Sequence, residues 1–179
     1  SRDLSRPIEE VIKLDQRDEQ TVYTELTEYV TTKRIREQYI EVLKPISEGP
    51  GDPSEATGVW VSGFFGSGKS SFAKNLGYIL SNRSLNGIPA SQIFLQRLQE
   101  QAPNDESTKK IGDLLNYITA RIPTQTIMFD VQVDRAVRRS TETLAEIMYT
   151  VLLRELDYAQ DFDIANLEIE LESEKRLSK

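Results

Sequence analysis

The stretch that decides the expected fold reads Val59-Trp60-Val61-Ser62-Gly63-Phe64-Phe65-Gly66-Ser67-Gly68-Lys69-Ser70. From Gly63 onward it matches the P-loop pattern of a glycine, four variable residues, a glycine, a lysine and a serine or threonine. A short β-rich run precedes the motif, and apolar residues follow it at helical spacing: Phe72, Leu76, Ile79 and Leu80. A strand, a P-loop and a helix in this order predict an α/β fold, namely a P-loop NTPase core with a partial parallel sheet and flanking helices.

The residues of the motif suit the chemistry of a bound magnesium nucleotide. Glycines permit the backbone angles that turn successive N–H groups towards phosphate oxygens. Lys69 can reach the β- and γ-phosphates, and the Ser70 hydroxyl can ligate magnesium at a helix start whose positive end favours anions. We therefore predict a site for ATP and Mg²⁺ with Lys69 as the catalytic residue and Ser70 as the metal ligand. The residues predicted to bind the cofactor are Gly63, Phe64, Phe65, Gly66, Ser67, Gly68, Lys69, Ser70 and Ser71.

Two alternatives accompany this interpretation. A glycine-rich turn with an exposed lysine would give the same pattern without binding nucleotide. Phe64 and Phe65 occupy variable positions of the motif, where we expect them to pack beneath the loop, although contact with a partner is the other option. The strand before the motif and the helix after it favour the nucleotide site.

Helical patterns fill most of the remaining chain. Apolar residues recur at helical spacing before position 45 and over roughly 91–101, 108–121 and 144–156, and a last helix is expected from Asp163. Within the first segment, Thr31 or Thr32 is expected to cap a helix that Pro45 ends. Residues 46–57 are rich in glycine, proline and small polar residues, which is typical of a linker. The predicted organisation is an N-terminal helical segment at 1–45, a linker at 46–57, and a P-loop NTPase domain at 58–179 that is incomplete at its C-terminal end.

A second strand is expected over Gln125 to Val133, and it contains the acidic candidate for ATP hydrolysis. Asp130 follows an apolar run, as does the acid that holds magnesium through water in many ATPases. Val131 comes next, where many ATPases have a glutamate, so the alternative is that Asp130 simply faces solvent or ends a strand ladder. Two basic clusters raise the question of phosphate contacts, and we interpret both as surface residues: Lys33, Arg34 and Arg36, and Arg135, Arg138 and Arg139.

The composition limits the functions available. The 179 residues contain no cysteine and no histidine, which excludes disulfides, thiol nucleophiles and imidazole catalysis. The net charge of −7 disfavours broad contact with nucleic acid, so any DNA binding has to be local. No apolar run has membrane-spanning length, and the absence of cysteine suits a cytoplasmic protein. The composition leaves homo-oligomerisation open.

Four stretches together point to a known family. They are Arg6-Pro7-Ile8-Glu9-Glu10-Val11-Ile12-Lys13-Leu14-Asp15-Gln16, Glu25-Leu26-Thr27-Glu28-Tyr29-Val30-Thr31-Thr32, the P-loop line from Val59 to Ser70, and Ala165-Asn166-Leu167-Glu168-Ile169-Glu170-Leu171-Glu172. In these stretches the chain resembles the N-terminal part of BrxC, the family of large P-loop ATPases of bacteriophage-exclusion (BREX) defence systems. The resemblance implies an amino-terminal fragment or a short relative of a longer ATPase, in which Lys69 and Ser70 contact nucleotide and magnesium. It also implies that Asp130 lies on an outer strand, and that the water-activating acid and any arginine finger lie elsewhere.

The leading hypothesis for function is an ATP-binding and ATPase module of an antiviral defence complex, with other BREX proteins as partners. The 179 residues would then bind ATP without efficient turnover. Two other classes of protein use the same motif. One is a small nucleotide or metabolite kinase, and the other is a non-catalytic interaction domain whose fold is stabilised by bound nucleotide.

Overall fold

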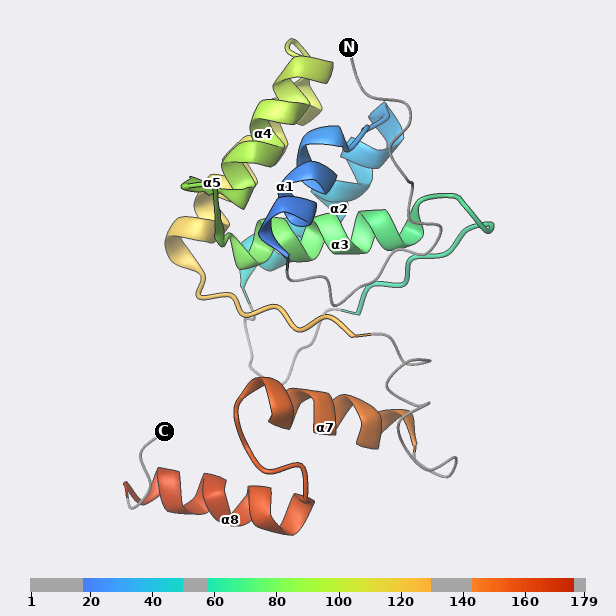
Figure 1. Ribbon diagram of the computed structural model, residues 1–179. Helices are drawn as coiled ribbons and strands as arrows, with labels where there is room; N and C mark the ends of the chain where they lie inside the picture. The colour runs from blue at the N-terminus through green and yellow to red at the C-terminus, as the bar shows by residue number, and fades with distance from the viewer. Residues whose placement is uncertain (1–17, 50–57, 130–142, 176–179) are drawn as a thin grey trace. The chain divides into compact units, whose positions relative to one another are not determined.

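The computed structural model describes residues 18–49, 58–129 and 143–175. These residues are mainly helical, and their elements are labelled in Figure 1. In chain order the elements are α1 (Glu19–Glu28), α2 (Lys33–Glu48), α3 (Lys69–Ser81), β1 (Ser84–Leu85), β2 (Ile88–Pro89), α4 (Ala90–Gln101), α5 (Glu106–Arg121), α7 (Leu144–Glu155) and α8 (Phe162–Ser173). The chain divides into two compact units, Ser1–Thr126 and Ile127–Lys179. Within the described ranges, no helix is both long enough and apolar enough to cross a membrane.

Side-chain caps begin both α1 and α2. The Asp18 carboxylate accepts a hydrogen bond from the Thr21 amide at 2.8 Å, and the Thr32 hydroxyl accepts one from the Ile35 amide at 3.3 Å. Such caps satisfy amide groups that have no partner inside the helix. Of the two candidate caps for α2, Thr31 and Thr32, the structure therefore confirms Thr32.

The predicted end of the helix at Pro45 is wrong, because α2 continues to Glu48. A proline removes one amide hydrogen bond from a helix, but tertiary packing can hold the helix beyond it. Here Leu43, in the preceding turn, is fully buried, and α2 packs along α5. The helix ends instead at Gly49, whose φ of 68° few other residues adopt and whose amide donates to the Ile46 carbonyl at 3.2 Å.

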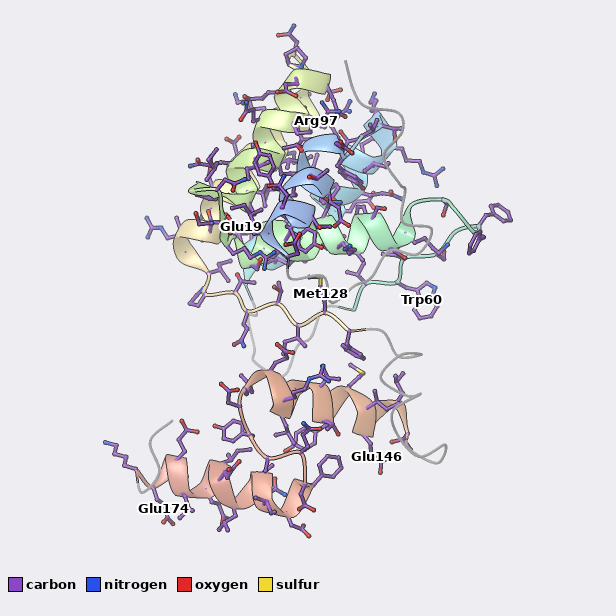
Figure 2. The ribbon with its side chains drawn as sticks, in the orientation of Figure 1. Glu19, Trp60, Arg97, Met128, Glu146 and Glu174 are labelled. Carbon is purple, nitrogen blue, oxygen red and sulfur yellow. The ribbon has the colours of Figure 1, made fainter. Side chains whose placement is uncertain are left out.

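The predicted parallel sheet is wrong. The strands of the described residues are β1 and β2, which are two residues long each and pair antiparallel, with Ser84 opposite Pro89 and Leu85 opposite Ile88. Residues 58–64 form neither a helix nor a paired strand. Trp60 in this segment is 92% exposed and projects away from the helices (Figure 2). A β-rich composition does not make a strand unless a neighbouring strand accepts and donates the ladder hydrogen bonds.

The second predicted strand, Gln125 to Val133, is also not formed where the structure describes it. Residues 123–129 have no strand pairing, and residues 130–133 lie outside the described ranges. A parallel pair would need both segments to be extended side by side, and β-propensity alone cannot bring them together. In the described residues the protein is therefore a helical arrangement with one small antiparallel hairpin, and not the predicted α/β fold.

An aromatic cluster forms the centre of the first unit. Tyr39 of α2 lies with its ring centroid 4.6 Å from that of Phe72 in α3 and 5.0 Å from that of Phe94 in α4. Tyr29, which follows α1, lies 6.3 Å from Phe94 between ring centroids. These distances are typical of favourable aromatic pairs. The helices before the P-loop and the helices after it therefore share one core.

A buried arginine joins the start of α2 to the start of α5. The Arg36 guanidinium donates to the Thr31 carbonyl at 2.9 Å, the Ser107 hydroxyl at 3.0 Å and the Asp105 carboxylate at 2.8 Å. The Asp105 carboxylate also accepts from the Ser107 amide at 2.8 Å and so caps α5. The surface interpretation of Arg36 is therefore wrong, since the side chain satisfies three acceptors inside the fold.

Acid is expected to weaken this network. Hydrogen bonds from the Ser107 hydroxyl and amide, and then from Arg36, lower the pKa of Asp105 from 3.8 to about 2. A carboxylate with a lowered pKa in the folded state stabilises the fold above its unfolded pKa, and this contribution is lost as the pH falls from 3.8 to about 2. We expect Asp105→Asn to be less stable at neutral pH and to lose less further stability over that acid range in urea titrations. Identical pH dependence in both proteins would contradict this role of Asp105.

In the described part of the second unit, polar and aromatic contacts join α7 and α8. A capping box begins α7, in which the Thr143 hydroxyl accepts from the Glu146 amide and the Glu146 carboxylate accepts from the Thr143 amide. The rings of Tyr149 in α7 and Phe162 in α8 lie 5.2 Å apart between centroids. The Tyr158 hydroxyl also donates to Glu172. The helices predicted near 144–156 and from Asp163 are confirmed.

Candidate nucleotide-binding site

Two glycines of the P-loop motif adopt backbone angles that other residues rarely adopt. Gly66 and Gly68 have φ angles of 75° and 85°, in the left-handed region that favours glycine. α3 begins immediately afterwards at Lys69, and the Phe72 amide donates to the Gly68 carbonyl at 2.9 Å. No described side chain caps this helix. Its first amide groups therefore remain available to an anion at the positive end of the helix.

The Lys69 side chain folds back over the loop. Its Nζ donates a hydrogen bond to the Phe64 carbonyl at 2.7 Å, and the Ser67 amide donates to the same carbonyl at 3.2 Å. A methyl group added to Gly63 would come within 2.7 Å of the Ser67 hydroxyl oxygen, so this glycine permits a close approach of the two arms of the loop. The lysine ammonium is therefore held against the backbone of the loop.

The two serines that follow the lysine lie in different settings. Ser70 is exposed in the first turn of α3. Ser71 lines the pocket beside the loop, and its carbonyl accepts a hydrogen bond from the Asn75 amide group at 2.8 Å. Within the described residues, no group of three or more acidic side chains could hold a metal ion by itself. A magnesium ion at this place would therefore depend on Ser70 together with phosphate oxygens and water.

Phe64 and Phe65 do not pack beneath the loop. Phe64 is 91% exposed, and Phe65 is fully exposed. The predicted packing of the two rings is wrong, because the sheet that would lie under the loop is not formed in the described residues. Figure 1 shows this part of the chain leading away from the helices before it returns to α3.

A pocket of about 760 Å³ opens beside the P-loop, within the first unit. One side is formed by the loop and the first turns of α3, including Lys69 and Ser71. Other lining residues come from α1, α2 and the connection between them, and they include Tyr29, Val30 and Arg34. The volume is in the range of pockets that bind small molecules and cofactors, and apolar and charged side chains converge in it. Arg34 is exposed, so its prediction as a surface residue is confirmed, and its side chain also lines this pocket.

A buried ion pair ties α1 to α3 at the edge of this pocket. Lys74 is 1% exposed and its Nζ donates to the Glu25 carboxylate at 2.7 Å. The Tyr78 hydroxyl donates to the other oxygen of Glu25 at 3.0 Å. Burial, and then the neighbouring Glu25 charge, raises the pKa of Tyr78. The pair was missed from the sequence because Glu25 and Lys74 lie far apart in the chain and each has the appearance of a surface residue.

An unpaired acceptor also lies in the lining of the pocket. Asn75 is 3% exposed, and its amide nitrogen is used in the bond to the Ser71 carbonyl. This bond fixes the orientation of the amide, because the Asn75 oxygen could not donate to a carbonyl. The oxygen has no partner among the described residues. Buried acceptors are rarely left unsatisfied, so a ligand with a hydrogen-bond donor would suit this part of the pocket.

Several predicted residues lie outside the described ranges. They are Asp130, the candidate magnesium-organising acid, and the cluster of Arg135, Arg138 and Arg139. The described site therefore consists of the P-loop, the start of α3 and the facing part of α1 and α2. No protein-family model matches the chain, and no solved structure matches it either.

Proposed function

We propose that the chain binds a magnesium-bound nucleoside triphosphate, ATP, at Gly63–Ser70. The observation that carries the proposal is the start of α3. Two left-handed glycines lead into an uncapped helix whose first residue is Lys69. This arrangement concentrates amide donors, the helix dipole and one ammonium group at a single point, which is what a polyphosphate requires.

Binding would exchange one set of hydrogen bonds for another. The Lys69 ammonium now donates to the Phe64 carbonyl, and a phosphate oxygen would replace that neutral acceptor with a charged one. The exposed Ser70 hydroxyl would ligate the magnesium ion that the triphosphate carries. The polyphosphate would lie at the loop, and the adjacent pocket would receive the remainder of the nucleotide.

The resemblance to BrxC supports a biological setting for this binding. We propose that the chain acts as the ATP-binding module of an anti-phage defence ATPase in the cytoplasm, with other BREX proteins as partners. The same observations suit binding better than turnover, because hydrolysis needs an acid that positions water in addition to the P-loop. The described part of the pocket contains Glu25 and Glu28, of which Glu25 is already paired with Lys74.

Lys69→Ala tests the proposal directly. We expect about 10- to 100-fold weaker binding of magnesium ATP in calorimetry, because the variant loses a charge-assisted hydrogen bond to phosphate. Lys109→Ala is a matched control, since Lys109 is an exposed helical lysine outside the pocket. Unchanged binding in Lys69→Ala, or no binding of ATP by the natural sequence, would exclude the P-loop as a nucleotide site.

The products of ATP turnover distinguish this proposed function from that of a small nucleotide or metabolite kinase. We expect slow ATP hydrolysis by the 179 residues alone and no phosphorylation of added small molecules. Rapid transfer of the γ-phosphoryl group to a nucleotide or metabolite, without a protein partner, would favour the kinase instead. The measurement is the release of inorganic phosphate compared with the formation of a phosphorylated acceptor.

A further inference from the structure

Arg34 is a charged side chain of the pocket that the P-loop motif does not account for. It lies in the first turn of α2, is exposed, and lines the same pocket as Lys69. Its neighbours in the sequence have other roles. Thr32 caps the helix, Lys33 does not line the pocket, and Arg36 is buried in its contacts with Asp105.

Among the described residues, the charged side chains of the pocket have partners other than Arg34. Lys74 is satisfied by Glu25, and Lys69 by the Phe64 carbonyl. The remaining acid of the lining, Glu28, has an interaction of its own, whereas Arg34 has no hydrogen bond or ion pair among the residues that the structure describes. A guanidinium in a pocket, with its donors unused, is suited to a planar anionic group such as a phosphate.

The hydrogen-bond donors of the P-loop would not reach all three phosphates of a triphosphate equally. The loop amides and the helix start surround the phosphate that lies within the loop, and Lys69 is the one side-chain cation that the motif provides. The terminal phosphate carries the most negative charge and reaches beyond the loop, so a second cation from the opposite side of the pocket would suit it.

We propose that Arg34 contacts the terminal phosphate of the bound triphosphate, so that the helices before the P-loop complete the nucleotide site. This inference rests on the proposed binding of ATP at Lys69. It has a consequence that the P-loop alone does not have: the chain would distinguish ATP from ADP through a residue of α2. The presence of the third phosphate would then be sensed by the helical segment that packs on α3 through Tyr39 and Phe72.

The test is the ratio of ATP to ADP affinity in Arg34→Ala, measured by calorimetry on the whole chain with magnesium present. We expect ATP to bind about tenfold more weakly and ADP to change by less than about twofold, because only ATP has the third phosphate. Arg34→Lys should recover part of the preference, since lysine keeps the charge but loses the bidentate fork. Lys33→Ala, an adjacent exposed cation outside the pocket, should leave both affinities unchanged.

Other outcomes separate this inference from the proposed function. Equal weakening of ATP and ADP in Arg34→Ala, or no weakening of either, would overturn the role of Arg34. If Lys69→Ala still weakens ATP in the same experiment, the P-loop site stands without Arg34. If Lys69→Ala has no effect on ATP, the P-loop site itself fails. Melting curves should be unchanged in Arg34→Ala, because the exposed side chain has no partner among the described residues.

Discussion

Replacing Glu25 with leucine is expected to destabilise the first unit by about 3–5 kcal/mol, because it leaves the buried ammonium of Lys74 without a counter-charge. The Lys74 side chain is 2% exposed and its Nζ lies 2.7 Å from the Glu25 carboxylate. The substitution also removes the acceptor of the Tyr78 hydroxyl. Such a loss is a large part of the total stability of a domain of this size. Urea unfolding followed by circular dichroism measures the change in free energy.

Two further variants show whether the buried charge is the cause. Glu41→Leu removes an exposed carboxylate from α2, and we expect it to change the free energy of unfolding by less than about 0.5 kcal/mol. Adding Lys74→Met to Glu25→Leu removes the unpaired charge and should recover much of the lost stability. A double variant no more stable than Glu25→Leu would show that the packing around Glu25, and not the charge of Lys74, causes the loss.

Phe94→Ala is expected to destabilise the same unit by about 3–5 kcal/mol, because it removes a fully buried ring from the centre of the core. Phe94 lies 5.0 Å from Tyr39 and 6.3 Å from Tyr29 between ring centroids. The cavity would therefore lie between the helices that precede the P-loop and those that follow it. The comparison of unfolding free energies in urea gives the loss.

The control for Phe94→Ala is Tyr117→Ala in α5, where the aromatic side chain is 53% exposed. We expect this change to cost far less, since little buried area and no cavity are involved. Phe72 lines the pocket and packs against Tyr39, so Phe94→Ala should also weaken magnesium ATP binding through a loosened pocket. Similar losses in the two alanine variants would mean that Phe94 is not the centre of the core.

The helices of this protein could be predicted with few errors because their signals are local. Apolar residues at helical spacing placed α4 and α5, and a threonine before an apolar pattern placed the start of α2. The burial of Arg36 also had a local signal. Arg36 lies on the same helical face as Tyr39 and Leu43, three and seven residues later, and both of these are fully buried.

The parallel sheet could not be predicted reliably from the same sequence. Val59–Val61 has the composition of a strand, but a strand exists only when a neighbour completes its ladder. In the structure this segment has no strand pairing, and Trp60 is exposed. The helix that follows the P-loop did not depend on this neighbour, since its hydrogen bonds lie within the segment.

The sequence by itself determined the P-loop from Gly63 to Ser70, the helix that begins at Lys69 and most of the other helices, because each of these depends on residues close together in the chain. The tertiary structure alone decided that Glu25 pairs with Lys74, that Arg36 is buried against Asp105, and that Arg34 shares a pocket with Lys69. The residues of these pairs lie from 35 to 69 positions apart in the chain, and only the packing of α1 and α2 against α3, α4 and α5 brings them to the same part of the fold.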